Sequence, residues 1–471
     1  MRRNLVTFAL LFSAGAASAC SKAPAPDEGK PGESTAKTVS YYRDVKPILD
    51  GRCIDCHTDG GIAPFSLSTY GDLYPWLSQI KRQVTSRTMP PWTAGADCNE
   101  YIGDPSLSDA QIQAIASWVD GGGLEGDPAD EGAPIPGDEA EAQFRVGVRL
   151  EMPADYTPSL TPDEYRCFVL PWPEERPTYI TGLSLRPGNK ALVHHSVLTL
   201  VEPESVKIFT DLDDADPGQG YTCFTNGNIA SSSGAKTSLI GALEKPENGR
   251  LFPHETGLLV KPGSAVILQL HYNTLATGGP AADRTSVEFS TAKEVPHPAH
   301  AVFSTDPRWI LQKDTMHIAA GDPDAWVAAA VPAGFVSSSP EFDLHWADLH
   351  MHTLGSHGEL SLIHADGTKE CLLRVDQWKF QWQQTFYLKN PVHVTASDQL
   401  YIECHWDNTI SHQYVVDGVP LPTHDVSWGD GSRDEMCLGN YLVTSDQQTA
   451  DAGAVGADAA AAGPDAAGAA H

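Results

Sequence analysis

The chain has 471 residues, too many for a single ordinary hydrophobic core, so two or three domains are expected. Its composition is that of a globular protein, and its 41 glycines and 35 prolines favour short elements and many turns over long helices. The formal net charge of −30 argues against nucleic acid or an anionic membrane surface as a partner and favours solubility.

The first twenty residues have the pattern of a signal peptide. Two arginines precede an apolar run over residues 5–12, and small residues lead to Cys20. This pattern predicts a lipoprotein that is cleaved before Cys20 and lipidated on it; ordinary cleavage after residue 19 is the alternative. Either way the protein is expected to be exported. The lipoprotein pattern predicts a periplasmic, outer-membrane or cell-surface lipoprotein of a Gram-negative bacterium. No later run approaches ~20 apolar residues, so the lipid is the expected membrane attachment.

The remaining chain divides by composition into five stretches. Residues 21–38 are predicted to be a disordered tether, and residues 39–122 have helical spacing of apolar residues, with a helix start at Ser108. Residues 123–142 are a Gly/Asp/Glu/Pro linker. Residues 143–445 alternate short apolar runs with turn residues, which is typical of an all-β sandwich architecture. Residues 446–471 are Ala/Gly/Asp-rich and are predicted to be disordered.

The helical stretch carries the motif Arg-Cys-Ile-Asp-Cys-His. Two thiols close together on the chain can add to the vinyl groups of a haem, and the adjacent His57 can bind its iron, so Cys53, Cys56 and His57 predict one covalent haem c. A redox dithiol or half a zinc site is the alternative, but only Cys98 is near enough to add a zinc ligand. Met89 is predicted to be the sixth ligand, with a buried core methionine as the alternative. The segment resembles a small mono-haem cytochrome c, which implies electron transfer from an external donor.

Three histidine clusters stand out in the β region. They are the adjacent pair His194 and His195, the single His271, and the pair His350 and His352. Residues two apart on a strand point to the same face, so His350 and His352 can share one metal ion, with Met351 on the other face. Adjacent histidines need a strand end or a bulge to do so. Taken singly, each histidine is better explained as a structural residue.

In order and spacing, this set resembles the copper type II, ascorbate-dependent monooxygenases, the peptidylglycine α-hydroxylating and dopamine β-hydroxylating enzymes. The resemblance implies one copper ion at His194, His195 and His271. It implies a second copper ion at His350, His352 and Met436, the catalytic site. It also implies a mainly β fold with two antiparallel jelly-roll domains, at 143–290 and 291–445, that face each other across an open cleft.

Nine cysteines fit this organisation. Cys20 and the two haem cysteines leave six, which suggests up to three disulfides in an oxidising compartment. The resemblance implies the disulfides Cys167–Cys223 and Cys404–Cys437. Whether the last two cysteines, Cys98 and Cys371, pair with each other stays open.

The resemblance further implies an enzyme that uses dioxygen to hydroxylate a C–H bond of a small substrate, with the fused haem in place of ascorbate. Asp348 stands where the peptide enzyme has an arginine for the substrate carboxylate, which argues against a glycine-extended peptide and favours a cationic or neutral substrate such as an amine. A solvated carboxylate, or one that supports a ligand, is the alternative for Asp348. Two other functions compete: a non-catalytic copper-binding or electron-transfer surface protein, and a copper oxidase with the haem as electron acceptor.

Overall fold

A computed structural model of the protein describes residues 38–61, 63–135, 144–161, 163–223, 234–243, 249–274, 277–380, 382–416, 419–429 and 433–445. The predicted signal peptide, Cys20, nearly all of the tether and the predicted disordered tail lie outside these residues. The described residues from Val39 onward belong to one unit. In the part of the chain that is described, no helix is long and apolar enough to cross a membrane.

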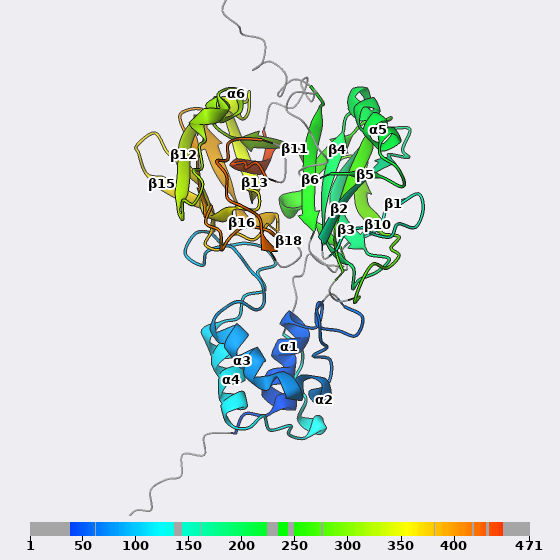
Figure 1. The fold of residues 1–471 in the computed structure, drawn as a ribbon, viewed down its shortest axis with the longest axis vertical. Helices are drawn as coiled ribbons and strands as arrows, with labels where there is room; N and C mark the ends of the chain where they lie inside the picture. Colours follow the sequence, from blue (N-terminus) through cyan, green and yellow to red (C-terminus); the bar gives the residue numbers. More distant parts are fainter. Residues whose placement is uncertain are drawn as a thin grey trace, which may run out of the picture. The chain divides into compact units, whose positions relative to one another are not determined.

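The helical stretch forms the elements drawn in blue to cyan in Figure 1. They are the π-helix η1 (Tyr41–Val45), α1 (Lys46–Arg52), α2 (Tyr70–Leu73), the 3-10 helix η2 (Tyr74–Trp76), α3 (Leu77–Thr85), α4 (Asp109–Asp120) and the 3-10 helix η3 (Pro128–Asp130). Helix α4 begins as predicted at Ser108, whose hydroxyl accepts from the backbone N–H of Gln111 while the Gln111 side chain accepts from Ser108 N–H. The apolar faces of these helices enclose one small core that contains Tyr41, Leu73 and Trp118.

The predicted linker differs from the structure in its first part. Residues 123–135 pack back on the helices, because the carbonyl of Leu124 accepts from the Tyr41 backbone N–H at 2.8 Å and from the Trp118 indole N–H at 2.9 Å. Ile135 N–H donates to the carbonyl of Pro47 at 3.1 Å. The helical body therefore extends to residue 135. The rest of the predicted linker, residues 136–142, lies outside the described residues.

In the described residues of the first half of the β region there are ten strands and one main helix. They are β1 (Val148–Glu151), β2 (Asp163–Pro171), β3 (Thr178–Arg186), β4 (Val193–Val201), η5 (Pro203–Ser205), α5 (Val206–Ala215), β5 (Tyr221–Thr222), β6 (Thr237–Leu243), β7 (Arg250–Leu251), η6 (Pro253–Glu255), β8 (Thr256–Val260), β9 (Ala265–Asn273) and β10 (Ser286–Ala292). A five-stranded sheet, β5-β2-β9-β4-β6, packs its apolar side chains against those of β1, β10, β3 and β8.

The second half contains β11 (His297–Ser304), α6 (Pro307–Leu311), η7 (Lys313–Thr315), β12 (Ala325–Pro332), η8 (Ala333–Phe335), β13 (Glu341–His350), β14 (Gly355–Ile363), β15 (Lys369–Val375), β16 (Phe386–Thr395), β17 (Gln399–Trp406), β18 (Val415–Val416), β19 (Val419–Pro420) and β20 (Leu438–Thr444). A four-stranded sheet, β12-β17-β14-β15, packs over the side chains of β13, β16 and β20. Each half is thus a β-sandwich, and the predicted mainly β class is confirmed. The assignment of the helical N-terminal part to a cytochrome c domain stays a prediction.

The two halves are joined through a shared sheet. One nine-stranded sheet has the order β1-β10-β3-β8-β11-β20-β13-β16, with β7 beside β3. Strand β11 pairs in parallel with β8 of the first half and antiparallel with β20 of the second half. The boundary predicted at residue 290 therefore lies inside β10, a strand of the sheet that both halves share.

A loop of the helical stretch lies on the second β half, which the sequence boundaries did not predict. Gly95 N–H donates to the carbonyl of Arg374 at 2.7 Å, and Ile102 N–H donates to the carbonyl of Tyr387 at 2.8 Å. The disulfide Cys98–Cys371 bridges 273 residues of chain to close the same contact. Residues 92–103 therefore belong structurally to the second sandwich, although the sequence places them inside the predicted cytochrome domain.

Candidate metal centres

The first histidine cluster forms on neighbouring strands of the five-stranded sheet. In the register, His195 on β4 lies opposite His271 on β9, and the register shifts between Val193 and His195. This irregularity provides the bulge that two adjacent histidines need in order to face one site. Hence His194, His195 and His271 come together, with donor atoms that all lie within 4.8 Å of one another.

The geometry of this first cluster fits a metal ion. The Nδ1 atom of His195 lies 3.3 Å from Nδ1 of His194 and 3.3 Å from Nδ1 of His271. Three ring nitrogens that converge in this way are better placed to direct their lone pairs at one cation than to form hydrogen bonds with one another. Imidazole nitrogens suit copper in both of its common oxidation states, so the donor set fits copper.

Asp163 holds His271 in the orientation that a ligand needs. His271 Nε2–H donates to Asp163 Oδ1 at 2.9 Å, which leaves Nδ1 for the metal. Burial raises the pKa of Asp163, but hydrogen bonds from His271, Asn273 and Tyr414 outweigh it and keep that pKa below its ordinary value. Burial lowers the pKa of His271, and the charge of Asp163 opposes this only in part. The ring of Tyr165 stacks on His271, with centroids 4.3 Å apart.

The second histidine pair lies at the end of β13. The rings of His350 and His352 have centroids 5.3 Å apart, and Met351 between them is buried in the core of the second sandwich. His350 Nδ1–H donates to Gln383 Oε1 at 3.0 Å, and His352 Nδ1–H donates to the carbonyl of Asp434 at 3.0 Å. Both rings thereby direct Nε2 away from these anchors.

The buried Nε2 atom of His350 has no hydrogen-bond partner among the described residues. A buried polar atom without a partner costs free energy, and a metal ion would remove that cost. Burial, followed by the neighbouring His352, lowers the pKa of His350 to about 3, so the ring is neutral and its lone pair is available at physiological pH. The pair therefore fits a metal site.

Met436 lies directly after two residues that hold His352. The Glu435 carboxylate accepts from the backbone N–H groups of His352 and Leu354, each at 2.7 Å, and from the Trp406 indole N–H at 2.7 Å. Burial raises the pKa of Glu435 to about 8, and these hydrogen bonds oppose the rise. Met436 itself is buried. A thioether donor favours Cu(I), so Met436 has the chemistry that the predicted site requires, and its role as a copper ligand stays a prediction.

One segment between β15 and β16 contacts both histidine sites. Trp382 lies edge-on to His194, with centroids 5.8 Å apart. The Phe380 ring lies 5.7 Å from Tyr165 of the first half and 6.2 Å from His352 of the second. Together with Gln383, these residues form what we call the bridging segment, Phe380, Trp382 and Gln383. The open cleft that the family resemblance implies therefore contains protein side chains here.

The haem motif follows helix α1 in a turn. His57 N–H donates to the carbonyl of Cys53 at 3.0 Å, and Cys56 N–H donates to the same carbonyl at 3.3 Å. His57 Nδ1–H donates to the carbonyl of Phe65 at 3.0 Å, which leaves Nε2 for iron, and burial lowers the pKa of His57. These residues fit a c-type haem. Met89 is 39% exposed, and its role as the sixth ligand stays a prediction.

The structure forms three disulfides: Cys167–Cys223, Cys404–Cys437 and Cys98–Cys371. The first two are the pairs that the family resemblance implies. The third answers the question that the sequence left open. Cys437 follows Met436, so the disulfide to Cys404 ties the methionine loop to β17.

Asp348 is buried, unlike a residue that contacts a substrate in an open cleft. It is only 6% exposed and accepts from the Asn440 side-chain amide at 2.8 Å. Burial raises the pKa of Asp348 to about 7, and the bond from Asn440 opposes the rise. The interpretation of Asp348 as a solvated carboxylate is thus wrong. The predicted attraction of Asp348 for an amine substrate requires an exposed carboxylate, and the Asp348 side chain lacks that exposure.

Residues at these sites that the sequence did not predict include Asp163, Tyr165, Phe380 and Gln383. The first two stand in the run Asp-Glu-Tyr-Arg-Cys, in which only the cysteine has a role predicted from the sequence. The last two stand in Trp-Lys-Phe-Gln-Trp-Gln-Gln, a dense mixture of aromatic residues and glutamines between two strands. Such a mixture is a signal for a functional loop, because a plain connection has little use for several large aromatic residues.

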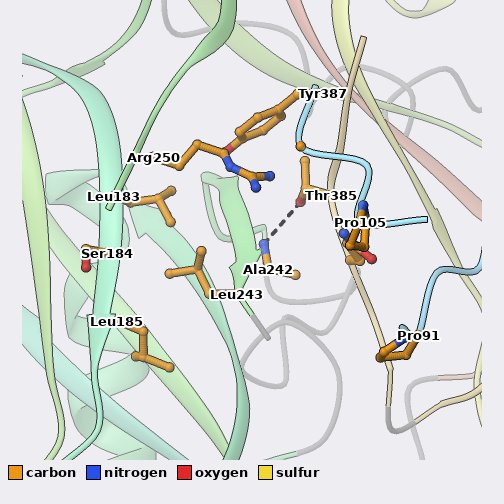
Figure 2. Close-up of a pocket in the computed structure, with 12 residues that line it drawn as sticks. Pro91, Pro105, Leu183, Ser184, Leu185, Ala242, Leu243, Arg250, Thr385 and Tyr387 are labelled. Atoms are coloured by element: carbon orange, nitrogen blue, oxygen red, sulfur yellow. Dashed lines mark hydrogen bonds between the residues drawn. The ribbon is translucent and has the colours of Figure 1, made fainter. Parts of the chain in front are cut away.

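A small pocket, drawn in Figure 2, includes Gln384, the residue directly after the bridging segment, in its lining. It is lined by strands β3, β6 and β7, the start of β16, and loop residues that include Pro91, Gly103 and Pro105. Arg250 places its guanidinium 5.5 Å from the centre of the Tyr387 ring. Gly103 lies beside that guanidinium and has a φ of +75°, a left-handed backbone conformation that favours glycine. The pocket contains none of the predicted site residues.

Two histidine-rich sites on two β-sandwiches define a metalloprotein whose donors suit copper. Residues 342–449 match the family model "Copper type II ascorbate-dependent monooxygenase, C-terminal domain". This stretch includes His350, His352 and Met436. This part of the second half of the chain is therefore similar to the C-terminal domain of copper type II, ascorbate-dependent monooxygenases, a family of copper-dependent oxidoreductases.

No curated protein matches the chain. Among solved structures, the major capsid protein P2 of bacteriophage PM2 is 9% identical over 64% of this chain and 99% of that chain, with a TM-score of 0.23. The VP2 subviral particle of infectious bursal disease virus is 11% identical over 67% of this chain and 75% of that chain, with a TM-score of 0.13. Scores this low say nothing about the function of this chain.

Proposed function

We propose that the protein is an exported copper-dependent monooxygenase that hydroxylates a C–H bond of a small organic substrate with dioxygen and receives electrons through a fused c-type haem. The observation that carries the proposal is that two histidine sites suited to copper meet at the same bridging segment. When bound, copper would supply the dioxygen and one-electron chemistry of the family, and the haem would supply single electrons from an external donor.

The protein groups prepare both sites for this chemistry. Asp163 and Gln383 each accept the N–H of one histidine ring and so fix which nitrogen faces the metal. Glu435 fixes the backbone on either side of Thr353 and thereby the position of His352. These anchors are in place in the protein by itself, which lowers the ordering cost of binding the ions.

The bridging segment gives the two sites a shared boundary. Phe380 and Trp382 place aromatic rings against residues of both histidine clusters. Aromatic side chains at these positions exclude water from the space beside the ligands, which strengthens electrostatic interactions there. A reaction that uses dioxygen and a reactive copper site needs this protection from side reactions.

The loop from Trp92 to Gly103 supports the proposed role of the haem motif. Trp92 packs edge-on against Phe386 at the start of β16, with centroids 5.0 Å apart, and Tyr101 contacts both rings. Met89 lies three residues before Trp92 in the chain. The chain is therefore held on β16, the strand that follows the bridging segment, from three residues after the predicted haem ligand. A fixed connection of this kind suits an electron donor that is part of the same chain.

Isotope labelling of the product tests the proposal. The full-length protein, loaded with copper and haem, is supplied with a reductant and ¹⁸O₂ and screened on amines, phenethyl compounds and short peptides. The proposal predicts one ¹⁸O atom in a hydroxylated product. A product oxidised without ¹⁸O would support the copper oxidase interpretation. Two copper ions bound without any turnover would support the non-catalytic interpretation.

A methionine pair provides the control for the oxygen site. Met436→Ile removes the thioether and is expected to abolish product while the haem absorption spectrum stays unchanged. Met316→Ile changes an equally buried methionine of the same core and is expected to keep activity. Normal turnover by Met436→Ile would show that Met436 does not hold the oxygen-activating copper.

A further inference from the structure

A third group of metal-ligating side chains lies on the outer face of the four-stranded sheet. Asp324, His357 and His405 each offer one donor atom, and these atoms all lie within 4.8 Å of one another. Asp324 immediately precedes β12, His357 lies on β14 and His405 lies on β17. Because β17 pairs with β12 on one side and β14 on the other, His405 is the central member.

The backbone brings the two histidines together. His357 is opposite His405 in the register, and the register shifts between Gly355 and His357, so that Ser356 is the extra residue of a bulge. The two imidazole rings stack with centroids 3.9 Å apart and planes at 20°. Without the bulge, the pleat would direct the side chain of residue 357 to the other face of the sheet.

This cluster is separate from the proposed copper sites because it lies on the opposite face of β17. Side chains alternate along the strand, and the neighbours Cys404 and Trp406 are fully buried, whereas His405 is partly exposed. Trp406 reaches Glu435 and Cys404 reaches Cys437 on the inner face. The outer cluster therefore has its own access from solvent.

The hydrogen bonds around His405 have the arrangement that is typical of a metal ligand. His405 Nε2–H donates to Glu403 Oε1 at 3.1 Å, and the Tyr401 hydroxyl donates to the other oxygen of that carboxylate. Its Nδ1 lies 2.8 Å from Asp324 Oδ1. A ligating histidine commonly donates its second ring N–H to a carboxylate, which fixes the tautomer and leaves the first nitrogen for the ion.

His357 is suited to the same role. Its Nδ1 lies 3.0 Å from the Ser356 hydroxyl, which leaves Nε2 as the ring nitrogen that can bind a metal ion. Burial, together with the neighbouring His405, lowers the pKa of His357. The carboxylates of Asp324, Glu403 and Asp376 oppose this in part and add negative charge nearby.

We propose that Asp324, His357 and His405 form a third metal site, for a divalent transition-metal ion of the zinc type. Two imidazoles and one carboxylate are donors that Zn²⁺ prefers, with a fourth position left for water. The charges of Asp324 and Glu403 balance the ion. Since the three ligands come from or adjoin three neighbouring strands, the bound ion ties together the sheet that anchors the methionine loop through Cys404.

Zinc binding to the full-length protein tests the site. The protein is first loaded with haem and anaerobically with Cu(I), which the histidine and methionine sites favour, and is then titrated with Zn²⁺ under the same conditions. The wild type is expected to bind one equivalent of zinc that His357→Ala and His405→Ala each lose. Equal zinc binding by the wild type and both variants would overturn the proposal, as would the absence of that equivalent in the wild type.

A matched control separates a site from an ordinary ion pair. His393 on β16 forms the same kind of contact with Asp343, 2.8 Å between Nδ1 and Oδ1, and the described residues place no third metal-ligating group with this pair. His393→Ala is expected to keep the full zinc stoichiometry. An equal loss of bound zinc in His393→Ala and His405→Ala would show that zinc binds non-specifically to surface ion pairs, and would overturn the proposed site.

Fluorescence provides a second readout that does not depend on a histidine variant folding. Trp326 stacks over His405 with centroids 6.0 Å apart and is 60% exposed. Co²⁺ bound at the cluster is expected to quench Trp326, prior saturation with Zn²⁺ is expected to prevent this, and Trp326→Phe is expected to lack the zinc-sensitive component. Quenching that zinc does not prevent, or that persists unchanged in Trp326→Phe, would contradict the proposal.

Discussion

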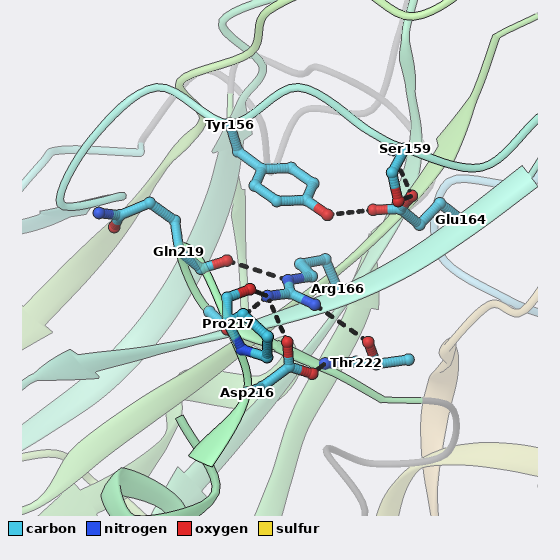
Figure 3. Close-up of polar contacts among 9 residues, drawn as sticks. Tyr156, Ser159, Glu164, Arg166, Asp216, Pro217, Gln219 and Thr222 are labelled. Atoms are coloured by element: carbon cyan, nitrogen blue, oxygen red, sulfur yellow. Dashed lines mark hydrogen bonds and ion pairs between the residues drawn. The ribbon is translucent and has the colours of Figure 1, made fainter. Parts of the chain in front are cut away.

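The buried guanidinium of Arg166 is expected to be a major source of stability for the strand that supports the first histidine site (Figure 3). Arg166 is 5% exposed and lies on β2, next to Tyr165 and close to Asp163. It makes five hydrogen bonds, to the carbonyl oxygens of Gln219, Pro217 and Gly220, the hydroxyl of Thr222 and the carboxylate of Asp216.

Arg166→Met removes all five bonds and leaves the buried acceptors with fewer partners. At about 1 kcal/mol for each bond the loss would be about 5 kcal/mol, and removal of one partner of a buried ion pair costs about 3–5 kcal/mol. Acceptors near the surface recover some bonds with water, because the Asp216 side chain is 24% exposed. We therefore expect the free energy of unfolding to fall by about 3–5 kcal/mol.

Urea unfolding with the disulfides kept oxidised measures this loss. Arg149→Met is the control, since Arg149 is 53% exposed and its ion pairs with Glu151 and Glu288 are expected to contribute about 0–1 kcal/mol. A difference between the two variants of less than about 1 kcal/mol would refute the reasoning, because it would mean that the buried network contributes no more than a surface pair.

Three further predictions concern the proposed copper sites. Asp163→Asn is expected to weaken copper binding at the first histidine site about 10- to 100-fold, measured by competition with a Cu(I) chelator, because the carboxylate that orients His271 is lost; an unchanged affinity would contradict that role. Gln383→Leu is expected to weaken copper binding at His350 by a similar factor of about 10 to 100, with no effect on the first site. Trp382 is expected to be quenched by Cu²⁺ at the first site, so Trp382→Phe should lose that component of the fluorescence change.

The sequence predicted the local features well because they depend on short-range patterns. Alternating apolar runs indicated the β-sandwiches, and the adjacent His194 and His195 required the irregularity that β4 contains. The capping residue of helix α4 was visible at Ser108. In each case the deciding physics lies within a few residues of chain.

The features that were missed depend on contacts between distant segments. No periodicity predicts that β11 joins β8 to β20, or that the loop at Cys98 lies on the strand at Cys371. The approach of Trp382 to His194 joins residues from different sandwiches. Such pairings are set by the packing of whole sheets, so a single sequence does not reveal them.

The cluster of Asp324, His357 and His405 also depends on contacts between segments that are distant in the sequence. His357 and His405 each follow or precede ordinary strand residues, and the sequence gives no sign that a bulge at Ser356 aligns them. They became a candidate site only through the register of β14 against β17.

The most direct test of the central claim is the stoichiometry of Cu(I) and haem in the purified full-length protein under anaerobic, reducing conditions. The account predicts two copper ions and one covalent haem per chain. It further predicts that His271→Ala and His352→Ala each lose one copper ion and keep the haem. Copper binding that neither variant reduces, or a chain that retains no copper, would contradict the account.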